Sequence, residues 1–248
     1  MLEGWWAFCD LQFGKNELLS GKEIGMSTLL TINVKNLEPQ TQGFFFFQQP
    51  AIYAGGPTVY SNSLYEQSLG NYSSTGSILT FQVNMQYYAG IQEAHSTPAV
   101  GQSSGYSSAS RAIDLAPADG SPANDFTQAT VSPALGLSTP THADGVQAGA
   151  FRIATPAFSS PPFYNVGSAV EVNGGITLSN FVQSNPQSNT DCEPILKYYV
   201  ATGQYTAGTV MDFTQSSQTA GLCDFTGGYT VIDISLGANG TWQVTDRQ

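Results

Sequence analysis

The chain has 248 residues, a length that suits one large β domain or two small ones. Charged residues make up only 10% of it, against the usual ~25%, whereas aromatic residues reach 12%. This composition excludes a coiled coil and a charged helical bundle. Seven basic and eighteen acidic residues give a net charge of −11, so no basic surface for phosphate groups can be assembled. We therefore expect neither nucleic acid nor a membrane as a partner.

The first 25 residues are richer in charge than the segment that follows. They include Glu3, Asp10, Lys15, Glu17, Lys22 and Glu23. A strand-like pattern begins only after Met26, so we expect residues 1–25 to form an appended tail, with one helical turn over residues 16–19. The short apolar run near the start has no basic lead, and no run of roughly 18 apolar residues occurs. We expect a cytoplasmic protein.

Apolar residues alternate with polar ones in the segment after Met26, as is typical of half-buried strands. The pattern predicts strands over Leu30–Lys35 and over Thr80–Tyr87. Phe44–Phe47 is a continuous apolar run that ends before a proline, which predicts a strand buried on both faces.

Two Asn-Gly pairs mark tight antiparallel turns in the second half. Asn173-Gly174 separates the alternating runs 170–172 and 176–178, and Asn239-Gly240 separates 232–236 from 241–244. Further strands are expected over 195–201 and 209–213. The chain is thus predicted to be all-β, with residues 26–248 forming a single antiparallel β-sandwich, either jelly-roll-like or made of two packed sandwich halves.

A central region, from about residue 93 to 162, is rich in Ser, Ala and Pro. A structureless connection of this length is unusual inside a compact domain. We expect short strands near 126–131 and 148–154, joined by long ordered loops. A linker between two independent domains is the alternative.

Read in order, several stretches resemble the RhiA family, the rhizosphere-expressed bacterial proteins and their fungal relatives. The resemblance covers about Thr28 to Val244 and is carried by VKNLEPQTQGFFFFQQP, VYSNSLYEQSL, LTFQVNMQYYAG, GVQAGAFRI, KYYVATGQYTAGTVMDFT and GANGTWQV. It implies a compact β protein without a signal peptide. It brings no established reaction and no catalytic residues.

Residues suited to catalysis or metal binding are scarce. His95 and His142 lack further ligands at zinc-binding spacing, so we expect no metal and no cofactor. Gly101-Gln102-Ser103-Ser104-Gly105 has the form of a nucleophile elbow, and aspartates and His142 follow it in hydrolase order. It lies in a Ser/Gly-rich segment without the strand and helix that this motif needs. Cys192 and Cys223 have acidic neighbours, which predicts inert thiols or one disulfide bond.

Tyrosines offer the more suggestive pattern, because they combine large apolar faces with hydroxyl groups beside many Asn, Gln and Ser residues. Candidate ligand-binding residues are Tyr87, Tyr88, Tyr198, Tyr199 and Asp212. Core packing is the alternative for each tyrosine. Asp212 in an apolar run predicts either a structural cap or a group that orients a ligand.

These features favour a non-catalytic binding or interaction protein for a neutral polar or amphipathic ligand, such as a glycan or small metabolite. One alternative is a cofactor-free isomerase or cyclase whose β cavity uses tyrosines with Asp191, Asp212, Asp224 or Asp233. Another alternative is a self-assembling structural protein, because the strands are apolar and carry little charge.

Overall fold

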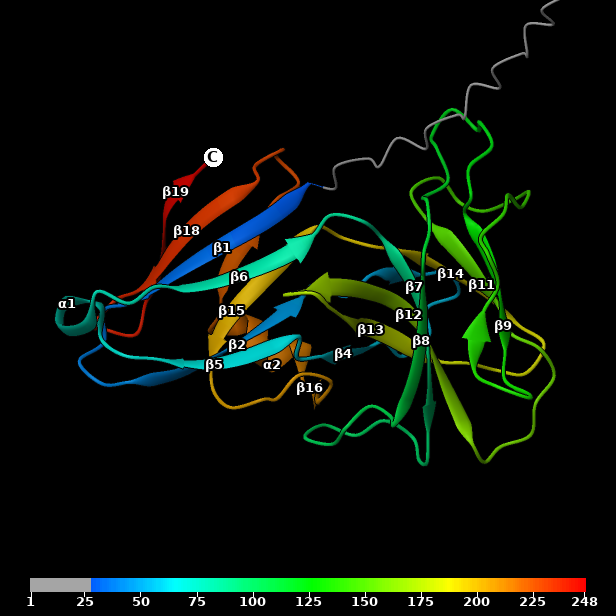
Figure 1. The fold of residues 1–248 in the computed structure, drawn as a ribbon, viewed down its shortest axis with the longest axis horizontal. Coiled ribbons are helices and arrows are strands. Elements are labelled where there is room, and N and C mark those ends of the chain that lie inside the picture. Colours follow the sequence, from blue (N-terminus) through cyan, green and yellow to red (C-terminus); the bar gives the residue numbers. More distant parts are fainter. Residues whose placement is uncertain (1–27) are drawn as a thin grey trace, which may run out of the picture.

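The structure, a computed structural model, describes residues 28–248, so the predicted tail at residues 1–25 and its helical turn lie outside the described residues. The described residues form an all-β sandwich, as predicted, in which two halves share one large sheet (Figure 1). Two short helices accompany the strands, α1 (Tyr72–Thr75) and α2 (Phe213–Gln218). Within this part of the chain, no helix has the length and apolar character needed to cross a membrane.

The large sheet has ten strands and passes through both halves of the molecule. Its order is β16 (Val210–Met211), β4 (Tyr60–Asn62), β13 (Gly175–Gln183), β12 (Phe163–Val172), β6 (Leu79–Asn84), β1 (Leu29–Asn36), β18 (Val231–Leu236) and β19 (Trp242–Arg247), with β7 (Tyr88–Ala94) also beside β12 and β8 (Ser107–Ala112) beyond β7. The pairing is antiparallel except between β1 and β18.

Two smaller sheets cover the inner face of the large one. The four-stranded sheet contains β17 (Gly221–Asp224), β15 (Lys197–Thr202), β2 (Gln42–Gln48) and β5 (Tyr65–Leu69). The five-stranded sheet contains β10 (Gly136–Leu137), β9 (Phe126–Thr130), β11 (Phe151–Ala154), β14 (Asn189–Glu193) and β3 (Ile52–Tyr53). Each smaller sheet encloses one hydrophobic core against the large sheet.

The two cores are joined by β12. Val170 and Val172 of this strand belong to the first core, whereas Tyr164 and Val166 belong to the second. At one end β12 pairs with β6 and along the rest of its length with β7, while β13 pairs with its other edge. One strand therefore fixes the relative position of both halves.

The predicted alternation is confirmed in β1, where every second residue is buried. The Phe44–Phe47 strand is also confirmed as buried on both faces: Phe44 and Phe46 lie in the first core. Phe45 and Phe47 point to the other side of the four-stranded sheet, where α2 and neighbouring aromatic residues cover them.

The prediction of a strand over Thr80–Tyr87 is wrong at the C-terminal end. β6 ends at Asn84, and Met85 is exposed. Val83 lies opposite Val172, whereas Tyr88 lies opposite Ala169, so residues 84–87 face only residues 170 and 171. This bulge interrupts the regular alternation of buried and exposed side chains between β6 and β7. The pattern of polar and apolar residues does not reveal such a local change of register.

The Asn173-Gly174 turn is confirmed as the connection between β12 and β13, with positive φ at both residues (49° and 84°). The central region forms β8 to β11, and Phe151 and Ile153 of β11 lie in the second core. The strand predicted over 209–213 is shorter than expected, because β16 ends at Met211 and α2 begins two residues later.

Replacing Phe46 with Ala is expected to lower the free energy of unfolding by about 3–5 kcal/mol, because the residue is fully buried and its ring stacks on Phe81 at 4.2 Å. Urea denaturation followed by tryptophan fluorescence measures the loss. Ile52→Ala is the matched control: Ile52 is 55% exposed, and its truncation is expected to change stability by less than about 0.5 kcal/mol. Equal losses in the two variants would contradict the assignment of Phe46 to the core.

Candidate binding groove

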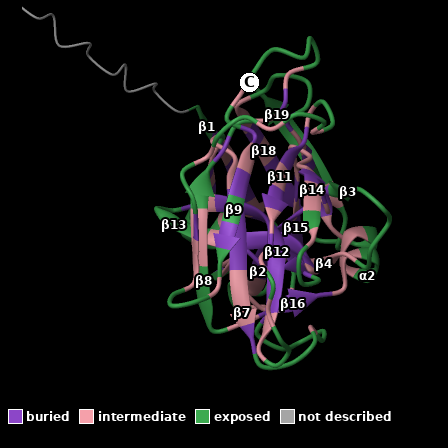
Figure 2. Ribbon diagram, turned by 90° about the vertical axis from the view of Figure 1, so that its right-hand side faces the viewer, coloured by how far each residue is buried: buried purple, intermediate pink, exposed green. Residues whose placement is uncertain are grey.

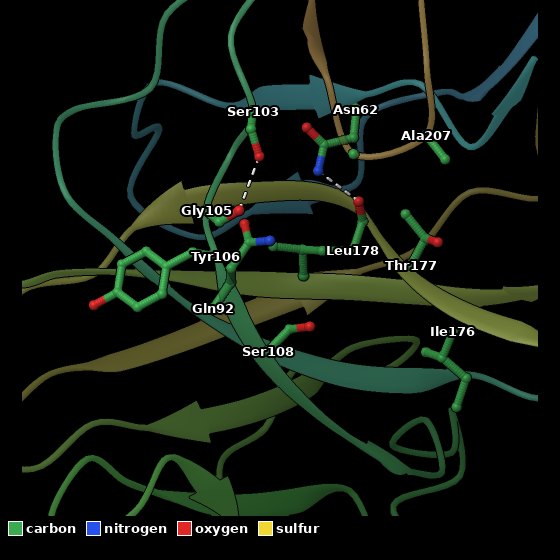
Figure 3. Close-up of a pocket in the computed structure, with 11 residues that line it drawn as sticks. Asn62, Gln92, Ser103, Gly105, Tyr106, Ser108, Ile176, Thr177, Leu178 and Ala207 are labelled. Atoms are coloured by element: carbon green, nitrogen blue, oxygen red, sulfur yellow. Dashed lines mark hydrogen bonds between the residues drawn. The ribbon is translucent and has the colours of Figure 1, made fainter.

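The outer face of the large sheet carries a groove across β8, β7, β12 and β13, which we call the outer groove. Its first part has a volume of about 240 Å³ and is lined by Asn62, Gln92, Ser103, Gly105, Tyr106, Ser108, Ile176, Thr177, Leu178, Ala207 and Gly208 (Figure 3). Its second part, about 140 Å³, is lined by Gly90, Ile91, Ser108, Ala109, Ser110, Ala169, Ile176 and Leu178. The parts are continuous because they share Ser108, Ile176 and Leu178.

Small residues keep the groove open. A Cβ atom on Gly90 would lie 2.7 Å from Leu178 Cδ1 and 3.2 Å from Ala169 Cβ, so only glycine fits between these side chains. β8 supplies serines to one side and is largely exposed (Figure 2). β13 supplies Ile176 and Leu178 to the other. The groove thus combines an apolar side with a hydroxyl-bearing side.

Asn62 lies at one end of the groove and is fully buried. Its Nδ2 donates to Leu178 O at 2.8 Å and to Ser104 Oγ at 2.9 Å (Figure 3). Since a backbone carbonyl can only accept a hydrogen bond, the atom of the Asn62 amide that faces Leu178 O must be the nitrogen. The Oδ1 atom of Asn62 therefore faces away from Leu178 O. Among the described residues, it accepts no hydrogen bond.

Two further buried amide oxygens surround the same loop, residues 103–105. Gln92 Oε1 and Asn165 Oδ1 also lack a hydrogen-bond donor within the described part of the chain. Asn165 Nδ2 donates to Ser104 O at 2.8 Å, while the Gln92 side chain packs directly against Gly105. A buried oxygen without a donor costs about 1–3 kcal/mol, so the packing around this loop leaves three hydrogen-bond acceptors unsatisfied.

Tyr106 stands at the mouth of the groove, half-exposed. Its ring stacks on His95 with ring centroids 4.0 Å apart. A hydrogen bond to Glu93 raises the pKa of Tyr106 to about 12, with burial adding to the effect. The two stacked rings form a flat, exposed aromatic surface next to the hydrogen-bonding end.

The structure does not bring the five sequence-predicted site residues together. Tyr88 packs against Ala169 and Leu178, which line the outer groove. Tyr87, its neighbour in sequence, is partly buried against the second core. Tyr198 is 1% exposed and fills the first core, so it is not a surface for a ligand in this conformation.

The remaining two predicted site residues lie on the far side of the four-stranded sheet. Tyr199 stacks on Phe47 at 5.2 Å and donates to Gln49 Oε1. Asp212 is the N-cap of α2, where its Oδ1 accepts from the backbone N–H of Gln215 at 3.0 Å. Of the two roles predicted for Asp212, the structure shows the structural cap.

The nucleophile-elbow pattern lies in the loop between β7 and β8, not between a strand and a helix. Ser103 Oγ donates to the Gly105 carbonyl, and Ser104 Oγ donates to Gly208 O. His142 instead contacts Asp125 and Asp144. No contact between Ser103 and His142 is present in the described residues, so the motif does not assemble a catalytic triad.

The aspartates considered for an isomerase or cyclase are dispersed as well. Asp191 pairs with Arg152, Asp233 accepts from Asn33 Nδ2, and Asp212 caps α2. Burial disfavours the charged form of Asp224, but hydrogen bonds from Thr226 and Lys197 outweigh burial and lower its pKa. Within residues 28–248, no group of three His, Cys, Asp or Glu side chains is arranged to hold a metal ion.

Cys192 and Cys223 are free and buried in different cores, so they do not form a disulfide bond with each other. Burial is the main cause that raises the pKa of each thiol to about 12. The acidic neighbours noted in the sequence add to the shift only at Cys192.

No pattern in the sequence marks Asn62, Gln92 or Ser108 as site residues. They come from three separate strands, and their roles depend on which strands are neighbours in the large sheet. An isolated Asn or Gln in a chain so rich in polar residues carries no distinguishing pattern.

Comparison of the chain with protein-family models, with curated proteins and with solved structures finds no match in any of the three.

Replacing Asp212 with Ala is expected to lower the free energy of unfolding by about 1 kcal/mol, because the cap of α2 is lost. Asp212→Asn keeps a side-chain oxygen that can cap and is expected to be almost neutral. Thermal unfolding of both variants measures the difference. An equal loss for Asn and Ala would show that the charge of Asp212 matters rather than its capping bond.

The thiols of Cys192 and Cys223 are expected to react extremely slowly with a disulfide reagent at pH 8, since both are buried and their raised pKa values leave almost no thiolate. A Cys9→Ser variant isolates these two residues. Labelling is expected to become fast in guanidinium chloride. Rapid labelling of the folded variant would contradict their burial.

Proposed function

We propose that this protein binds a polar, hydroxyl-rich molecule, an oligosaccharide or a related small metabolite, in the outer groove. The observation that carries the proposal is the buried Oδ1 atom of Asn62, which faces away from its own hydrogen-bonding partners. A ligand that donates a hydrogen bond to this atom removes the cost of leaving it unpaired. Hydroxyl groups are such donors, and they also accept bonds from nearby serines.

The shape and chemistry of the groove support a sugar-like ligand. A sugar ring presents hydroxyl groups around its edge and C–H groups on its faces. Ser108 and Ser110 offer hydroxyls on one side of the groove, and Ile176 and Leu178 offer an apolar surface on the other. Tyr106, stacked on His95, supplies an exposed aromatic face at the end of the groove.

Binding rather than catalysis is favoured by the groups that line the groove. Among the described lining residues, Tyr106 alone has an ionisable side chain, and its raised pKa leaves it protonated at neutral pH. General acid–base catalysis needs groups that exchange a proton near the working pH. The RhiA resemblance stays a prediction, and it supplies no reaction that would argue for an enzyme.

Filling the groove tests the proposal. Ser108 lies in both parts of the groove and is exposed, so Ser108→Trp is expected to fill the space without disturbing a core. A panel of neutral oligosaccharides screened by thermal shift, followed by calorimetry on any hit, is expected to show binding by the native protein. Ser108→Trp is expected to weaken that binding at least ~10-fold, as for a steric block of a small site.

Ser107→Trp is the matched control, because Ser107 is the adjacent exposed residue of β8 and its side chain points to the opposite face. This variant is expected to bind as the native protein does. Loss of binding in both variants, or in neither, would place the ligand outside the groove. Absence of any hit in the panel would remove the support for an oligosaccharide.

A further inference from the structure

We propose that the ligand of the outer groove carries a positively charged amino group, recognised by the carboxylate of Glu171. This inference rests on the proposed function and specifies the ligand further: an amino sugar chain rather than a neutral one. It is based on the position of Glu171 beside the groove, on the hydrogen bonds that hold its carboxylate, and on the absence of an ion-pair partner in the described residues.

Glu171 lies on the outer face of the large sheet, beside the outer groove. It is two residues from Ala169 on the same face of β12, and its cross-strand partner on β13 is Ile176. Ala169 and Ile176 line the outer groove. Glu171 itself lines a hollow of about 360 Å³ together with Leu29, Gln82, Asn84, Asn173 and Gly174. A chain lying along the outer face therefore passes over this carboxylate.

Neutral groups hold the Glu171 carboxylate in place. Tyr88 donates its hydroxyl to Oε2 at 2.8 Å, and Asn84 Nδ2 donates to the same oxygen at 2.9 Å. Burial and the bond to Glu171 raise the pKa of Tyr88 to about 12, so the tyrosine remains a donor at neutral pH. Both bonds orient the carboxylate, and neither neutralises its charge.

Within the described residues, Glu171 has no ion-pair partner. The cations that form ion pairs there are Arg152 and Lys197, both with other aspartates, while His142 lies beside two more. A half-buried carboxylate without a counter-charge attracts a cation, because the surrounding protein screens its charge less than water does. The net charge of −11 adds a longer-range attraction of the same sign.

A purely structural role for Glu171 is the competing explanation. Its two hydrogen bonds join Asn84 and Tyr88, which flank the bulge between β6 and β7. A glutamine would serve this role equally well, since its Oε1 accepts both bonds. The two explanations therefore differ in whether the charge matters for binding.

Two matched probes separate these explanations: cellohexaose and the hexamer of β-1,4-linked glucosamine. They share one backbone and differ in carrying a hydroxyl or an ammonium group at each C2 position. We expect calorimetry at low salt and mildly acidic pH, where the C2 amines are protonated, to show that the native protein binds the glucosamine hexamer about fivefold more tightly, as for a partly exposed ion pair. Raising the salt concentration is expected to reduce this preference and to leave cellohexaose binding unchanged.

Glu171→Gln is expected to remove the preference while retaining the melting temperature. Glu66→Gln, which makes the same charge change on β5 of the four-stranded sheet, is expected to keep it. Equal binding of the two probes by the native protein, or a preference that survives in Glu171→Gln, would overturn the inference. So would a failure of both probes to bind, whereas the proposed function fails if the neutral panel gives no hit or if Ser108→Trp and Ser107→Trp have the same effect on binding.

Discussion

The structure depends on β12, which must satisfy two hydrophobic cores and two sheet edges at once. Its inward side chains, Val166 and Val170, belong to different cores. Its edges are occupied by β13 on one side and by β6 and β7 in succession on the other. Because β6 and β7 meet along one strand, the chain between them bulges. Because side chains alternate, the outward residues of β12 include Ala169, which lines the groove, and Glu171, which lies beside it.

The same alternation explains which parts of the site were predictable. It identified the buried faces of β1 and Phe44–Phe47, since one face of a strand must enter a core. It also implies that adjacent tyrosines point to opposite faces of a sheet. Tyr198 accordingly enters the first core while Tyr199 lies on the far side. Of the pair at 87 and 88, only Tyr88 packs against residues that line the groove.

What the sequence could not provide is the set of neighbours across strands. Asn62, Gln92 and Leu178 converge because β4, β7 and β13 belong to one ten-stranded sheet. The spacing of these residues along the chain does not indicate the order of the strands in the sheet. Asp212 illustrates a local limit as well: the apolar run around it favoured a strand, yet its capping bond to Gln215 begins a helix there.

Polar burial in this protein is uneven, and the unevenness indicates where a ligand belongs. Most buried polar side chains are bonded, as with Asn180, whose Oδ1 accepts from the backbone of Ala51. Three unpaired amide oxygens instead lie around residues 103–105, and two of them belong to Asn62 and Gln92, which line the outer groove. Among the described residues, Gln48, Ser61 and Gln183 each have one unpaired buried atom as well. Glu171 lies beside the other end of the groove, with its carboxylate held by two neutral donors. The proposed ligand, a hydroxyl-bearing chain with an amino group, would meet hydrogen-bond acceptors at one end and a carboxylate at the other.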